Sequence, residues 1–98
     1  MKLISIVPAT NGKHKYTAKF EKDNGKNLIR HFGSAGMKDF TLFDATLREQ
    51  RKKLYLQRHS ARENWTDPTT AGSLSRYILW NLPAVSASIA DFKKRFNL

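Results

Sequence analysis

The chain has 98 residues, 40% of them apolar and eleven of them aromatic, so we expect one folded domain over residues 1–98 with a single core. Eighteen Lys and Arg against eight Asp and Glu give a formal charge of +10, which favours a polyanionic partner, nucleic acid first. The lack of cysteine excludes disulfides and thiolate metal sites, and no apolar run is long enough to cross a membrane. We therefore expect an intracellular, reducing location and no membrane partner.

The first third of the chain alternates between apolar and polar residues and is interrupted by turn residues, as in a β-meander. The alternating runs are Lys2–Val7, Lys15–Lys22 and Asn27–Phe32. The turn residues between them include Asn11-Gly12 and Asp23-Asn24-Gly25. This spacing predicts three antiparallel strands. In the second strand Tyr16, Ala18 and Phe20 share one face, so that strand should be half-buried with a basic outer side.

A helical pattern follows, with Asp44 as its N-cap and no Gly or Pro before about Asn64. Its apolar stripe is modest and contains Leu47, Leu54, Tyr55 and Ala61. Its cationic stripe is wide and contains Arg48, Arg51, Lys52, Arg58, His59 and Arg62. The cationic stripe is the most basic surface that the sequence predicts.

Two more helices are predicted in the last third of the chain. Asp67-Pro68 suits an N-cap followed by proline, so the second helix should run from Thr69 to Trp80. The third should begin near Ser86 or Ser88. Residues expected to face the core are Leu74, Tyr77, Ile78, Ile89, Phe92 and Phe96, whereas Lys93, Lys94 and Arg95 should face outwards. The predicted fold class is α+β, a small N-terminal three-stranded antiparallel sheet followed by about three α-helices.

The run Arg58–Trp65 combines three bases, one acid and an indole. On a helix Arg58 and Arg62 lie one turn apart, so their guanidinium groups form a fork that suits phosphate oxygens. His59 and Glu63 have the same spacing. The alternative is an exposed lattice of ion pairs at a helix end. We expect Trp65 to be an ordinary core anchor in either case.

Catalytic and cofactor signatures are weak. The acidic residues are scattered singly, and His14, His31 and His59 lack metal-ligand spacing. Segment 33–38 matches neither the P-loop nor the dinucleotide fingerprint, and a plain loop is the better interpretation. We therefore expect no metal, no cofactor and no enzymatic activity. A small hydrolase using His59 and Glu63 is the least favoured function.

The last two predicted helices also permit a helix-turn-helix interpretation. In that arrangement Ser88, Asp91, Lys94 and Arg95 would face the major groove. A simpler interpretation of Lys93, Lys94 and Arg95 is a patch that contacts phosphates, or a solvated face. The sequence leaves these alternatives open.

Two segments resemble known families. Residues 58–98 resemble a family of short basic proteins of nucleocytoplasmic large DNA viruses. The segments that carry this resemblance are Arg58-His59, Arg62–Trp65, Asp67-Pro68, Thr70–Gly72, Leu74–Arg76, Ile78–Trp80 and Ser88–Phe96. Residues 30–36 are faintly similar to the strand-end signature of WGR domains, with Phe32 in place of the Trp and Ser34 in place of the Arg. The first resemblance implies a viral source, and the second implies nucleic-acid binding.

Together these features predict a nucleic-acid-binding protein that contacts mainly the phosphate backbone of DNA or RNA. It would act as a genome-associated or virion component, in the particle or in the host cytoplasm or nucleus. The predicted contact residues are Arg48, Arg51, Lys52, Arg58, His59 and Arg62, supported by Lys93, Lys94 and Arg95. The alternative is a scaffolding protein of a viral particle whose basic face meets an acidic protein partner.

Overall fold

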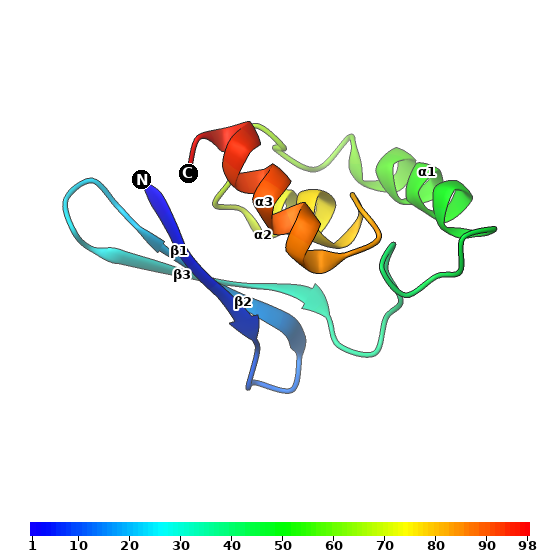
Figure 1. Ribbon diagram of the computed structural model, residues 1–98, viewed down its shortest axis with the longest axis horizontal. Coiled ribbons are helices and arrows are strands. Elements are labelled where there is room, and N and C mark those ends of the chain that lie inside the picture. Colours follow the sequence, from blue (N-terminus) through cyan, green and yellow to red (C-terminus); the bar gives the residue numbers. More distant parts are fainter.

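The computed structural model describes all 98 residues and begins with three strands, β1 (Lys2–Pro8), β2 (His14–Glu21) and β3 (Asn27–Ser34). They form one antiparallel sheet in the order β1-β2-β3, as Figure 1 shows. The predicted meander is therefore confirmed, and every strand end lies within two residues of its predicted position. Local alternation and turn residues are sufficient to define these strands.

Three helical segments follow the sheet, which confirms the α+β class. They are α1 (Arg48–His59), α2 (Ala71–Leu74) continued by one π-helical segment η1 (Ser75–Leu79), and α3 (Val85–Phe96). None of these helices combines the length and the apolar character needed to span a bilayer.

The first two helices begin three or more residues later than the proposed caps. The Asp44 carboxylate accepts hydrogen bonds from the backbone N–H of Thr46 and Leu47, and so closes a turn that precedes α1. Asp67 does the same for Thr69. Aspartates compete for local backbone amides in turns as readily as at helix starts, so the sequence pattern is ambiguous. The side chain that caps α2 is Thr70, which accepts the N–H of Ser73.

The core lies between one face of the sheet and the last two helices, which Figure 1 shows beside the sheet. Its buried members are Leu3, Ala18, Phe20, Phe32, Leu74, Ile78, Leu79 and Phe92. Tyr77, Ile89 and Phe96 pack against this cluster as partly buried residues. The inward positions predicted for the sheet and for the last two helices are therefore confirmed.

Helix α1 lies outside this core, at one end of the 44 Å long axis of the molecule (Figure 1). Its predicted apolar stripe is wrong for three of its four members: Leu47 and Leu54 are 42% and 44% exposed, and Ala61 is exposed as well. Tyr55 is the one buried residue of α1. Hydrophobic residues at helical spacing predict a broad contact face, whereas this helix buries a single aromatic ring.

The helix-turn-helix interpretation is also wrong in its central residue. Ser88 is fully buried, and its hydroxyl accepts the backbone N–H of Leu82 at 3.0 Å. Asp91 is half-buried and accepts a hydrogen bond from Asn81. This side of α3 therefore faces the turn that precedes it and cannot read base edges.

The surroundings of Gly33 show how closely β3 approaches η1. Its φ is +76°, and a Cβ atom there would lie 2.7 Å from Leu79 Cδ1 and 3.2 Å from Lys15 Cβ. We expect Gly33→Ala to lower the free energy of unfolding by about 2–3 kcal/mol, from left-handed strain plus overlap with a buried side chain. Gly12→Ala, at φ +72° with no atom within 4 Å, should cost only about 1 kcal/mol. Equal losses for the two variants in urea unfolding would show that β3 is not pressed against Leu79.

Candidate functional site

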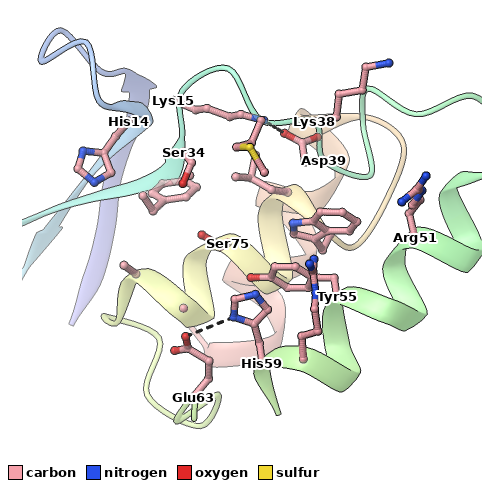
Figure 2. A pocket seen from close by; sticks show the side chains of 18 of the residues that line it. His14, Lys15, Ser34, Lys38, Asp39, Arg51, Tyr55, His59, Glu63 and Ser75 are labelled. Carbon is pink, nitrogen blue, oxygen red and sulfur yellow. Dashed lines mark hydrogen bonds and ion pairs between the residues drawn. The ribbon is translucent and has the colours of Figure 1, made fainter. Parts of the chain in front are cut away.

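A cleft of about 760 Å³ separates α1 from the end of the sheet, and η1 forms its floor (Figure 2). Its basic lining residues are Lys15, Lys38, Arg51 and Arg58, and its acidic ones are Asp39 and Glu63. All three histidines of the chain line it: His14, His31 and His59. The structure thus gathers cations and imidazoles that are far apart in the sequence. We call this site the basic cleft.

Asp39 fixes one wall of the basic cleft. Its carboxylate is only 3% exposed and accepts Lys15 Nζ at 2.5 Å and the Thr41 backbone N–H at 2.9 Å. The next residue, Phe40, donates its N–H to the carbonyl of Leu79. These bonds tie the loop between β3 and α1 to both the sheet and η1. The charge of Lys15 is therefore largely neutralised by a buried carboxylate.

An aromatic column forms the opposite wall. Tyr55 stacks on Trp80 with ring centres 4.4 Å apart and planes within 7° of parallel, and on its other side it stacks on His59 at 4.3 Å. Phe43 extends the column beyond Trp80 at 6.1 Å. The column joins α1 to the end of η1 and to the loop between β3 and α1, so it holds α1 in place.

The π-helical segment explains why Trp80 faces this site. The Trp80 N–H donates to the Ser75 carbonyl at 3.1 Å, an i to i+5 bond that places Trp80 one turn above Ser75. In a regular α-helix, the position one turn above Ser75 would fall between Ile78 and Leu79. Ser75, Leu79 and Trp80 consequently all line the basic cleft.

Two aromatic rings of the loop between β3 and α1 also gather cations of that loop and of α1. Arg48 Cζ and Lys52 Nζ lie 5.6 and 5.3 Å from the centre of the Phe40 ring. Arg51 Cζ and Lys38 Nζ lie 5.5 and 5.8 Å from the centre of Phe43. Together with Arg58, which lines the cleft, these four residues form what we call the basic rim: Lys38, Arg48, Arg51, Lys52 and Arg58.

Few cations of the chain are neutralised by acids. Of the eighteen Lys and Arg, only Lys15 and Arg95 have a carboxylate oxygen within 4.0 Å, which leaves sixteen without one. Every member of the basic rim belongs to the sixteen. The positive charge near the cleft is therefore available to an external anion.

The predicted contact residues divide into three groups. Arg51, Arg58 and His59 line the basic cleft, whereas Arg48 and Lys52 lie over the Phe40 ring and do not line it. Arg62 is exposed in the turn after α1 and does not line the cleft. The remaining three, Lys93, Lys94 and Arg95, lie in the last turn of α3, at the end that Figure 1 shows pointing away from α1. The structure does not join these three to the basic rim.

Several lining residues were not predicted as contacts. Lys15 was expected only as part of a basic strand face, and nothing in the sequence places His14 or His31 near His59. Lys38 lies in the loop segment 33–38, whose Ala35 and Met37 amides already donate to the carbonyls of Lys13 and Ser34. The first two residues of that segment end β3 and the rest form the plain loop that the sequence predicts. The residues of the segment that line the cleft are Gly33, Ser34, Met37 and Lys38.

The His59–Glu63 pair has a structural explanation. His59 Nδ1 and Glu63 Oε1 are 3.8 Å apart, longer than a hydrogen bond. The Glu63 carboxylate lies against Gly72 in the first turn of α2, where a Cβ atom would overlap it. A carboxylate at a helix start is electrostatically favourable. No group of three or more His, Asp or Glu side chains is arranged to hold a metal ion.

Trp65 is not the core anchor that the sequence predicts. It is half-buried, and the Arg76 guanidinium lies 4.0 Å from the centre of its ring. Arg76 also lies 4.8 Å from the ring centre of Tyr77, whose ring lies 4.7 Å from Arg95. Trp65 therefore supports a guanidinium at the edge of the fold, a role that its sequence context does not distinguish from burial.

The aromatic column predicts an alkaline weakening of the fold. Burial raises the pKa of Tyr55 to about 12, and the nearby Glu63 carboxylate adds to the rise. An unfolded tyrosine titrates near pH 10, so the stability from this group is complete below about pH 10 and is lost as the pH rises towards 12. Phenolate absorbance should therefore show one late titration that Tyr55→Phe removes. If that variant instead removes a titration centred near pH 10, Tyr55 is not buried as described.

No protein-family model matches the chain, and searches of curated proteins and of solved structures also find no match. The functional conclusion therefore depends on the geometry of the basic cleft and on the charge of the chain.

Proposed function

We propose that this protein binds DNA or RNA mainly through the phosphate backbone, with the basic rim as the principal contact. The observation that carries the proposal is the gathering of five cations on α1 and the loop before it, three of them lining one cleft and none with a carboxylate partner. A phosphate chain placed there would displace the small counterions of the nucleic acid, which is a favourable entropic term. It would also relieve the self-repulsion of a chain with a formal charge of +10.

The way the rim cations are held supports phosphate contacts. A guanidinium whose flat face lies on an aromatic ring keeps its N–H donors at the edge, where they can bind two phosphate oxygens. Arg48 Cζ over Phe40 and Arg51 Cζ over Phe43, at 5.6 and 5.5 Å from the ring centres, are close enough for this arrangement. Part of the side-chain entropy that binding would cost is already lost in the free protein.

We also propose a binding role and not a catalytic one. A general base must be oriented by a hydrogen-bonded partner, and the 3.8 Å between His59 and Glu63 does not supply that bond. Because Glu63 also lies against the start of α2, the structure gives it a separate role.

A genome-associated or virion role is the biological context that we propose, in keeping with the resemblance of residues 58–98 to proteins of large DNA viruses. The second candidate function is a scaffold that binds an acidic protein. It is favoured by apolar side chains near the basic rim, since Met37, Leu42 and Leu54 are 66%, 58% and 44% exposed. Protein contact surfaces commonly combine such residues with arginine.

Removing two rim cations should weaken nucleic-acid binding without changing the fold. We expect Arg51→Ala with Arg58→Ala to lower affinity roughly tenfold for every base sequence and to reduce the slope of log affinity against log salt by roughly 1.5 to 2. The matched control is Lys22→Ala with Lys26→Ala, which removes the same charge from the exposed β2–β3 turn (Figure 1).

Equal effects of the two double variants in fluorescence anisotropy would mean that net charge and not the basic rim controls binding. Tight binding to an acidic polypeptide, with none to oligonucleotides, would favour the scaffold instead.

A further inference from the structure

We propose that the basic cleft takes an unpaired base of a single-stranded nucleic acid, with the flanking phosphates on the basic rim. This inference rests on the proposed function and adds to it the kind of strand that is bound. It is carried by planar side chains that face the same cleft as the cations.

His59 offers the ring on which such a base would stack. One face of its imidazole is covered by Tyr55 at 4.3 Å, and no ring of the protein stacks on its other face. Its side chain is 38% exposed and lines the cleft. The inner rings of the column, Tyr55 and Trp80, stack against each other and position it. His59 is therefore the free end of a rigid, preformed stack.

The sheet supplies a second pair of rings. His14 and His31 stack with centres 5.7 Å apart, and Figure 2 shows His14 across the cleft from His59. His31 is held by a 2.8 Å contact with Thr17 Oγ1, and His14 by a 3.0 Å contact with Asn11 Nδ2. A flat group that entered the basic cleft would thus meet imidazoles on both walls.

An unpaired base suits the basic cleft better than a duplex does. The cleft has a volume of about 760 Å³, which lies within the range of pockets that bind small molecules. In a duplex the base faces are covered by neighbouring bases, so only backbone and groove edges reach a protein. An unpaired base can leave its stack and use the rings of the cleft.

The charges of the cleft are consistent with this ligand. Lys38, Arg51 and Arg58 line it without carboxylate partners, whereas Lys15 is offset by Asp39. Glu63 is the remaining acid, and it lies on the His59 side against Gly72. The phosphates would therefore follow the Lys38 and Arg51 side. Stacking of this kind tolerates any base, so little sequence preference is expected.

The test compares ligands that differ only in their bases. Oligothymidylate of about eight nucleotides, an abasic strand of the same length, a blunt duplex and thymidine monophosphate are titrated at one salt concentration. We expect oligothymidylate to bind roughly tenfold or more tightly than each of the other three. Equal or tighter binding of the abasic strand, the duplex or the monophosphate would overturn the inference. Loss of binding to every ligand would overturn the proposed function as well.

Two substitutions at one position separate stacking from structural damage. His59→Ala should abolish the preference for oligothymidylate while leaving the affinity for the abasic strand unchanged, because the rim cations remain. His59→Phe keeps a flat ring on Tyr55 and should retain the preference. A parallel loss of both affinities in His59→Ala, or failure of His59→Phe to retain the preference, would contradict stacking on this ring.

Discussion

The stack of Tyr55 on Trp80 is the contact on which the candidate site depends. Helix α1 has one buried residue, and the other side chains that attach it are cations lying on Phe40 and Phe43. A helix of twelve residues is marginal in water without tertiary contacts. If this stack were lost, the sheet and α3 would keep their shared core, but the basic cleft would lose one wall and the basic rim would lose four of its five cations.

Aromatic rings have two structural roles in this small protein. In the core Phe20, Phe32 and Phe92 exclude water, as in any α+β fold. Around the basic cleft other rings position cations or face the solvent space, which keeps positive side chains close together despite their repulsion. A chain with a formal charge of +10 cannot pack many lysines and arginines on one side unless something attracts them. Ring faces supply that attraction locally, and an external polyanion would complete it.

The sheet and α3 could be predicted because their signals are local, with alternation in Tyr16, Ala18 and Phe20 and helical spacing in Ile89, Phe92 and Phe96. The position of α1 could not, because only Tyr55 of its predicted apolar stripe is buried. Three members of the predicted cationic stripe, Arg51, Arg58 and His59, line the basic cleft. The pairing of β2 with β3 brings His14, His31 and Lys15 to the cleft, and one π-helical turn brings Trp80 there. Neither the pairing nor the π-helical turn leaves a pattern in the sequence.

Hydrogen exchange of the α1 amides in Tyr55→Ala tests this dependence most directly, with Leu54→Ala as the matched control on the exposed side of the helix. If the stack holds α1 in place, the α1 amides lose their protection in Tyr55→Ala, while the amides of β2 and α3 keep theirs. In the control variant the α1 amides also stay protected. Full protection of α1 in Tyr55→Ala would show that something else holds the helix and would contradict the account.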